Sequence, residues 1–200
     1  MTVTTIKSGS DEQLSGTRKE LSTDGSSTSF RGVLATHSRV IEVQHQTVDF
    51  HVDFEVFNQN LLDLLGRFNA NDVAKAGSDL QDALARLQVA QGKYGLMLFG
   101  EGLDHGALFP LIESPARKSI RYHIGSPLIA IKMERKNMGV ALYAPLTVLV
   151  YELSPGVVRV EYDLPSSMFG QFNDAEIDQV AAALNTKLYV VLLAAAGVSD

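Results

Sequence analysis

Two apolar runs joined by a short turn constrain the fold of this chain more than any other feature. The runs cover Leu146 to Leu153 and Val157 to Asp163, and both are rich in the β-branched and aromatic residues that strands favour. The turn between them is Ser154-Pro155-Gly156, which returns the second strand antiparallel beside the first. Pro165 cannot donate to a strand ladder and ends the second strand. The chain therefore contains an antiparallel hairpin that needs a covering layer.

An amphipathic helix after the hairpin can provide that layer. Asn173 is placed to cap it, with Glu176 completing a capping box. Its apolar positions recur at helical spacing and are Ile177, Val180, Leu184, Leu188 and Leu192. Leu188 to Gly197 is the most apolar stretch, and we interpret it as the buried end of this helix because it is too short to span a bilayer.

Two further helices are expected before the hairpin. Asp53 is placed to cap the first, whose apolar positions are Phe54, Phe57, Leu61, Leu65 and Phe68. The second is expected from about Asp72 to Lys93, and its buried face would comprise Val73, Leu80, Leu84 and Leu87.

Three more strands are expected from alternating or continuous apolar residues. They cover Arg39 to Phe50, Tyr94 to Phe99 and Ser119 to Ile124. Ser126-Pro127 predicts the start of a short helix that Gly139 would end, although Leu128 to Met133 could also form a strand. The resulting fold class is α+β, with an antiparallel sheet and helices packed on one face in the order β-α-β4-α.

The chain divides into two parts by composition. Residues 1–36 are rich in Ser, Thr, Gly and charged residues, and we expect this polar N-terminus to be disordered. Residues 37–200 would form a single domain, since a chain of 200 residues seldom builds two.

Charge and cysteine content exclude several functions. The net charge is −6 and no basic cluster is large enough for a duplex, so no nucleic-acid partner is expected. The chain has no cysteine, which excludes disulfides and thiolate metal sites and fits a cytoplasmic protein. The N-terminus lacks the apolar core of a signal peptide, so no membrane partner is expected either.

Four phrases in the second half resemble those of the DUF302 family, a domain family of unknown function. In chain order they are Asp104-His105-Gly106, Gly125-Ser126-Pro127-Leu128-Ile129-Ala130, Leu142-Tyr143-Ala144-Pro145-Leu146 and Tyr162-Asp163-Leu164-Pro165-Ser166-Ser167. The resemblance implies a curved antiparallel sheet of the TATA-box-binding-protein type. Ser126 departs from the family pattern, because it stands where the family usually has Asn. If the family's Asn contacts a ligand, that contact is weakened here, whereas if it only caps the next helix, Ser does the same.

Three of these phrases fall on breaks at strand ends, where rigid sheets commonly carry functional groups. We hypothesise that the three breaks converge on one cleft. The candidate ligand-binding or functional residues are Asp104, His105, Gly125, Ser126, Pro127, Tyr162, Asp163 and Ser166. His105 alone among them has an ordinary pKa near neutrality.

Binding of a small molecule in such a cleft is the leading functional hypothesis. An enzyme that uses His105 with a carboxylate for acid–base chemistry and a module that forms a homodimer are the alternatives. No cofactor is expected, because the Gly100 to Gly106 loop has the spacing GxGxxxG and no helix follows it. No metal is expected, since the histidines match no compact ligand motif.

Overall fold

The structure, a computed structural model, describes residues 37–74 and 79–198, so the predicted disordered segment 1–36 lies outside the described residues. The part from Val40 onward forms one α+β unit. Its strands are β1 (His45–Phe50), β2 (Gly66–Phe68), β3 (Met97–Phe99), β4 (Leu103–Asp104), β5 (Ser119–Gly125), β6 (Leu146–Ser154) and β7 (Val157–Asp163). Its α-helices are α1 (Phe54–Leu64), α2 (Ala70–Ala74), α3 (Leu80–Val89), α4 (Pro127–Glu134), α5 (Pro165–Phe169) and α6 (Ala175–Ala195). Three 3₁₀ helices are η1 (Gly106–Ile112), η2 (Met138–Tyr143) and η3 (Gly170–Phe172).

The strands form one mixed, mostly antiparallel sheet. Their order is β1-β7-β6-β5-β3-β2, and β4 pairs with the start of β5. The predicted hairpin is confirmed, because Val148 lies opposite Tyr162 and Val150 opposite Val160 in the β6–β7 register. The prediction of a wholly antiparallel sheet is wrong at one edge, where β2 runs parallel to β3.

Strand β2 replaces the end of the first predicted helix. Helix α1 stops at Leu64, and the backbone N–H of Gly66 donates to the carbonyl of Leu96 at 3.0 Å. A Cβ at Gly66 would lie 1.8 Å from the carbonyl oxygen of Ala90, so only glycine permits this crossing of two backbones. Phe68 therefore belongs to the sheet and stacks on Phe99 rather than extending the helical stripe.

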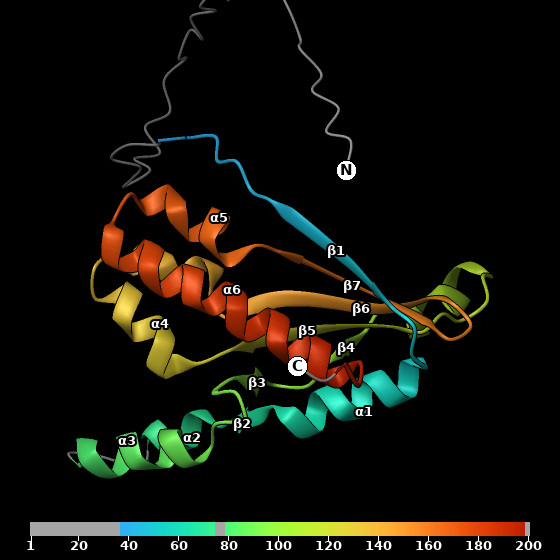
Figure 1. The fold of residues 1–200 in the computed structure, drawn as a ribbon, viewed down its shortest axis with the longest axis horizontal. Helices are drawn as coiled ribbons and strands as arrows, with labels where there is room; N and C mark the ends of the chain where they lie inside the picture. The colour runs from blue at the N-terminus through green and yellow to red at the C-terminus, as the bar shows by residue number, and fades with distance from the viewer. Residues whose placement is uncertain (1–36, 75–78, 199–200) are drawn as a thin grey trace, which may run out of the picture. The chain divides into compact units, whose positions relative to one another are not determined.

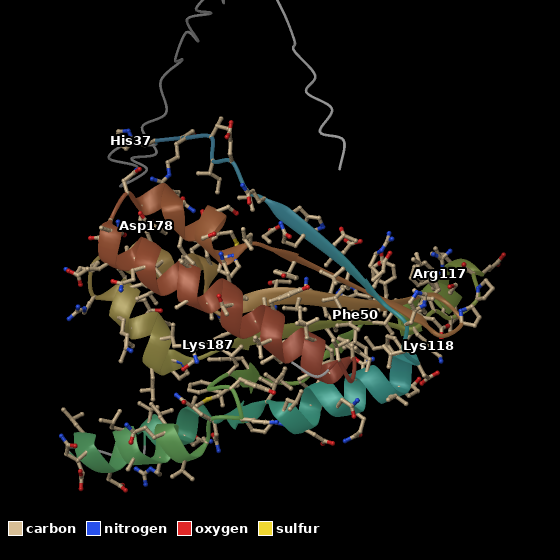
Figure 2. The ribbon with its side chains drawn as sticks, viewed as in Figure 1. His37, Phe50, Arg117, Lys118, Asp178 and Lys187 are labelled. Atoms are coloured by element: carbon tan, nitrogen blue, oxygen red, sulfur yellow. The ribbon has the colours of Figure 1, made fainter. Side chains whose placement is uncertain are left out.

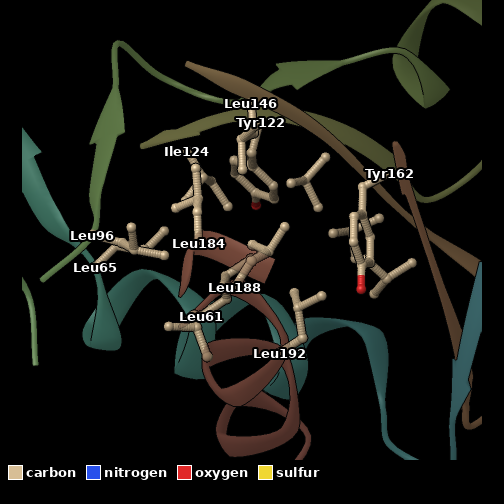
Figure 3. Packing of buried hydrophobic residues seen from close by; sticks show 14 of the residues in the cluster. Leu61, Leu65, Leu96, Tyr122, Ile124, Leu146, Tyr162, Leu184, Leu188 and Leu192 are labelled. Atoms are coloured by element: carbon tan, nitrogen blue, oxygen red, sulfur yellow. The ribbon is translucent and has the colours of Figure 1, made fainter. Parts of the chain in front are cut away.

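Helices α1 and α6 cover one face of the sheet (Figure 1). Figure 3 shows Leu61 of α1 and Leu184, Leu188 and Leu192 of α6 facing the side chains of the central strands. The predicted buried stripe of α6 is confirmed, with Val180 only partly buried. Tyr122, Ile124, Val148, Val150, Val158 and Val160 line the sheet side of this core.

The N-terminal end of α6 differs from the prediction. Asn173 adopts a left-handed backbone conformation, with φ 52°, after η3, so it cannot be the cap. Asp174 caps the helix instead, and its Oδ1 accepts from the N–H of Glu176 at 2.8 Å and of Ile177 at 3.2 Å. The Glu176 side chain pairs with Arg135 and Lys136 and forms no capping box.

Helix α6 is long and apolar enough to cross a membrane by length and composition alone, with a mean hydropathy of 1.3 over its most apolar stretch. Its inner positions, however, pack into the core of the domain, and Leu188, Val191 and Leu192 are fully buried. The interpretation of this apolar stretch as the buried end of a helix is therefore confirmed. The absence of a membrane partner stays a prediction.

The second predicted helix is wrong in extent and in its buried face. Two helices, α2 and α3, stand where one was expected, and residues 75–78 between them lie outside the described residues. Leu80 is 75% exposed and Leu84 39% exposed, whereas Ala83 is buried. Helix α3 presents its apolar side chains largely to solvent because it lies beside the short edge strands, away from the core (Figure 1).

Two element boundaries also differ. Strand β1 begins at His45 rather than at Arg39, and Val40 is almost fully exposed, because the β7 partner ends at Asp163 opposite His45. The helical alternative after Ser126-Pro127 is confirmed as α4, but this helix ends at Glu134. Gly139 lies in the following 3₁₀ helix.

Candidate functional site

The three predicted breaks do not converge on one cleft. The backbone N–H of His105 donates to the carbonyl of Ser119 at the start of β5, whereas Gly125 ends that strand. Six residues of extended chain span about 20 Å, so the loop of Asp104 and His105 lies at the opposite end of the sheet from Gly125 to Pro127. The hypothesis that His105 shares a cleft with this turn is therefore wrong.

The other two breaks lie at the same end of the sheet. Strands β5 and β7 both run antiparallel to β6, so the turn after Gly125 and the turn after Asp163 flank the start of β6. They are separated by that one strand, which places them about 10 Å apart.

The Asp104-His105-Gly106 phrase anchors a loop. The Asp104 carboxylate accepts from the N–H of Ala107 at 2.9 Å and so holds the first turn of η1. Gly106 is buried, and a Cβ there would lie 1.7 Å from the carbonyl oxygen of Arg117. His105 contributes its backbone to the same anchor. Each residue of the phrase thus has a structural role in fastening η1 to β5.

The serines after Tyr162 also have structural roles. Ser166 and Asn185 bond reciprocally, since the Ser166 N–H donates to Oδ1 of Asn185 at 2.9 Å and the Asn185 amide donates to the Ser166 Oγ at 2.8 Å. These two bonds fix α5 on α6. Tyr162 is buried against α6, and burial raises the pKa of its hydroxyl (Figure 3).

The turn from Gly125 to Pro127 differs, because it lines a pocket. Gly125 packs closely against Pro145, because a Cβ added at Gly125 would lie 3.2 Å from the Cβ of Pro145. Ser126 is 4% exposed, and its Oγ lies 3.4 Å from Nε2 of Gln91. Ser126 is the N-cap residue of α4 and Pro127 follows it at the start of the helix, as expected, but the Ser126 side chain makes no cap hydrogen bond.

This cavity, which we name the α4 pocket, has a volume of about 130 Å³ and lies beside α4. The β5–α4 turn, the start of β6, α5 and α6 complete its wall. Its apolar lining includes Phe99, Pro127, Ile129, Met133, Phe169 and Leu184. Among the described residues that line it, Glu134 alone carries a charge. Of the eight candidate residues, Gly125, Ser126 and Pro127 line this pocket.

A cluster of polar side chains lies on the sheet face opposite the core. Of its members, only Asp163 was among the residues predicted from the sequence. His45 of β1 lies between two carboxylates of β7, with Nδ1 2.9 Å from Oδ1 of Asp163 and Nε2 3.4 Å from Oε2 of Glu161. The hydrogen bond to Asp163 is the main reason that the pKa of His45 is raised. The Tyr151 hydroxyl donates to Glu161 at 2.7 Å.

The same face holds a bidentate ion pair between β1 and β7. The guanidinium of Arg159 contacts Asp49 at 2.6 and 2.7 Å, and this contact lowers the pKa of the Asp49 carboxyl. These pairs connect β1 to β7 on the polar face, so their plainest effect is to hold an edge strand in register. The alternation of charged and apolar residues from Arg159 to Asp163 could have revealed this face.

The polar face also carries a hollow of about 340 Å³ beneath η1, lined by Phe109, Tyr151, Leu153 and Glu161 among others. Arg117 and Lys118 lie at this end of the sheet (Figure 2). The Arg117 guanidinium lies 4.9 Å from the ring centre of Phe109, and Lys118 pairs with Glu152 at 3.2 Å. The two basic residues are thus engaged locally and form no extended patch.

Metal ligands are not gathered in the described part of the chain. Within residues 37–74 and 79–198, no group of three or more His, Asp or Glu side chains is arranged to hold a metal ion. The loop from Gly100 to Gly106 leads into a 3₁₀ helix that contains Pro110, which offers no regular helix N-terminus for a phosphate.

Comparison with known proteins supports a family and a fold. The model of the family described as "Domain of unknown function DUF302" matches residues 73–195. The crystal structure of an uncharacterized conserved DUF302 protein from Bacillus stearothermophilus is similar, with a TM-score of 0.51 and 15% sequence identity over 74% of this chain and 94% of that chain. No curated protein matches. Since the family match spans more than half of the sequence and includes the four phrases from Asp104 to Ser167, the chain belongs to the DUF302 family.

Proposed function

We propose that this protein binds a small, mainly apolar molecule in the α4 pocket. The observation that carries the proposal is the pocket itself, an apolar cavity bounded by the Gly125 to Pro127 turn. Apolar cavities with a few polar groups are the usual form of small-molecule sites. Two polar residues line this cavity, the buried Ser126 and the partly buried Glu134.

The volume of the pocket limits the size of the ligand. An engineered apolar cavity of about 150 Å³ takes up benzene, so a cavity of 130 Å³ suits a body of about six non-hydrogen atoms. A drug-sized ligand or a dinucleotide would need several times this volume. The proposed ligand is therefore a small metabolite or the apolar end of a larger molecule.

The fold supports the proposal indirectly. We infer that the sheet has the curved form of the TATA-box-binding-protein type, as the resemblance implies, with α1 and α6 filling one face. The α4 pocket then lies at the rim of this layer, where α4 and α5 leave the strands. Strand ends and the loops after them are common places for ligands in sheet proteins.

The two alternatives receive less support. The backbone of His105 anchors η1, and its side chain forms no ion pair with a residue in the described part of the chain, which weakens the acid–base hypothesis. His45 does face carboxylates, but its side chain is 54% exposed. The sheet face opposite the core carries Arg159, Glu161 and Asp163 rather than a broad apolar surface, so it does not favour a homodimer.

A pocket-filling variant tests the proposal. Ala130 lines the pocket, and Ala130→Leu would add three carbon atoms to a cavity of about 130 Å³. Ala141 is exposed and does not line the pocket, so Ala141→Leu is the matched control. Binding of 1-pentanol and benzene would be followed by amide chemical shifts and by calorimetry.

We expect both probes to shift amides around Ser126 and Ile129 in the wild type and in Ala141→Leu. They should cause no saturable shift in Ala130→Leu, whose circular dichroism should match the wild type. Equal binding by the two variants, or shifts confined to another part of the chain, would refute the proposed site.

A further inference from the structure

Among the described residues, the α4 pocket is lined by a single acidic one, Glu134, and this residue indicates the class of ligand. Glu134 is partly buried at the C-terminal end of α4, and it forms no ion pair or side-chain hydrogen bond with any residue in the described ranges. The rest of the lining is apolar apart from Ser126. A ligand that fills this pocket would remove water from the carboxylate, and an ionised group that loses water needs a partner.

The two cations that follow Glu134 in the chain are already engaged elsewhere. Arg135 and Lys136 follow Glu134 directly in the chain, yet both pair with Glu176 of α6. The Arg135 guanidinium lies 2.9 Å from Oε2 of Glu176, and together these two cations lower the pKa of the Glu176 carboxyl, Lys136 being the larger cause. The two cations are therefore held at α6 and do not pair with Glu134.

The second polar group of the pocket lies at the other end of α4. Ser126 is buried, and its Oγ takes part in one long contact, in which the Gln91 amide donates at 3.4 Å. No described residue accepts from its hydroxyl, so the O–H is available as a donor. Glu134 lies eight positions after Ser126, which corresponds to about 12 Å along the helix axis.

We infer that the ligand of the α4 pocket is a small primary amine, with its ammonium group at Glu134 and its short apolar chain in the cavity. An ammonium supplies the donors that the carboxylate lacks, and the apolar walls take the chain. The net charge of −6 also favours the approach of a cation over that of an anion. This inference rests on the proposed function, because it assigns a ligand class to the same pocket.

Three probes of equal length separate charge from shape. They are n-pentylamine, 1-pentanol and pentanoate, each of which has an apolar chain of the size that the cavity holds. Calorimetry or amide shifts at constant ionic strength would give the dissociation constants. We expect the wild type to bind n-pentylamine about fivefold tighter than 1-pentanol and to bind pentanoate most weakly, as for a partly exposed ion pair.

Two variants assign that preference to one side chain. Glu134→Gln keeps the shape of the residue and removes its charge, so n-pentylamine should bind it no tighter than 1-pentanol, whose affinity should not change. Glu101→Gln removes the same charge from an exposed loop residue outside the pocket and should retain the amine preference.

The outcomes distinguish the two proposals. The amine inference is overturned if 1-pentanol binds the wild type but n-pentylamine binds it no more tightly. It is also overturned if n-pentylamine still binds Glu134→Gln more tightly than 1-pentanol does. In both cases the proposal of a binding pocket stands. If none of the three probes binds, the proposed function itself fails.

Discussion

The hydroxyl of Tyr122 donates to the side-chain Oδ1 of Asn58 at 2.7 Å, and this bond joins the central strand β5 to helix α1 inside the core. Both residues are almost completely buried, and burial raises the pKa of Tyr122 to about 12. The Asn58 amide in turn donates to the carbonyl of Phe54 at 2.7 Å. A polar pair in an otherwise apolar layer fixes the register of the helix on the sheet, since each polar atom must meet its partner.

Removal of this hydroxyl should destabilise the domain. Tyr122→Phe would leave Oδ1 of Asn58 buried without a donor, at a cost of about 1–3 kcal/mol in the free energy of unfolding. Urea unfolding followed by circular dichroism gives this value. Tyr143→Phe is the control, because that hydroxyl is partly exposed and lies 3.4 Å from its acceptor on Gln171. Equal stability of Tyr122→Phe and wild type would show that the bond contributes nothing.

The C-terminal helix should depend on its inner face alone. Leu188 is fully buried between the sheet and α1, so Leu188→Ala should lower the free energy of unfolding by about 2–5 kcal/mol. Tyr189 is the next residue and is 44% exposed, so Tyr189→Ala should cost less than about 1 kcal/mol. A comparison of the melting curves of the two variants tests the orientation of α6. If both variants lost similar amounts of stability, this orientation would be contradicted.

The hairpin and α6 could be predicted because their signals are local. Strands β6 and β7 show the strand pattern and a turn sequence, and α6 repeats its apolar residues at helical spacing from Ile177 to Leu192. Strand β2 could not be predicted in this way, because it has only three residues. It exists because Gly66 lets two distant backbones meet at Leu96.

The candidate site was predicted in part for a similar reason. Gly125 to Pro127 stand out in the sequence, and they line the α4 pocket. In the sequence, Glu134 cannot be distinguished from an exposed helix residue, because the cavity that it lines forms only when α5 and α6 pack beside α4. His45 is separated from Asp163 by more than a hundred residues, and only the pairing of β1 with β7 brings their side chains together.

The ion pairs of His45 predict a dependence of stability on pH. The hydrogen bond that His45 donates to Asp163 raises the pKa of His45 in the folded state above its unfolded value of 6.5. Protonated His45 therefore stabilises the fold below pH 6.5, and this contribution is lost as the pH rises through the folded-state pKa.

The measurement is the difference in melting temperature between wild type and His45→Gln. We expect wild type to be the more stable at about pH 5.5 and the difference to shrink by about pH 8. His123 lies exposed on the same face of the sheet and forms no ion pair with any described residue, so His123→Gln is the control variant. A difference of constant size for His45→Gln would contradict the assignment.

The phrase Asp104-His105-Gly106 contains a histidine beside a carboxylate, a combination that suggests a catalytic residue. In the structure, the glycine is the residue that the backbone requires, because any side chain at Gly106 meets the Arg117 carbonyl at 1.7 Å. Gly106→Ala should therefore displace η1 and lower the melting temperature by several degrees, whereas Gly170→Ala should not, since no atom lies within 4 Å of a Cβ there. His105→Ala removes a partly exposed ring and keeps the backbone bond to Ser119, so it should change stability by less than about 0.5 kcal/mol and leave binding of 1-pentanol unaltered. Weakened binding in His105→Ala with unchanged stability would instead connect this loop to the ligand and restore a functional role for the histidine.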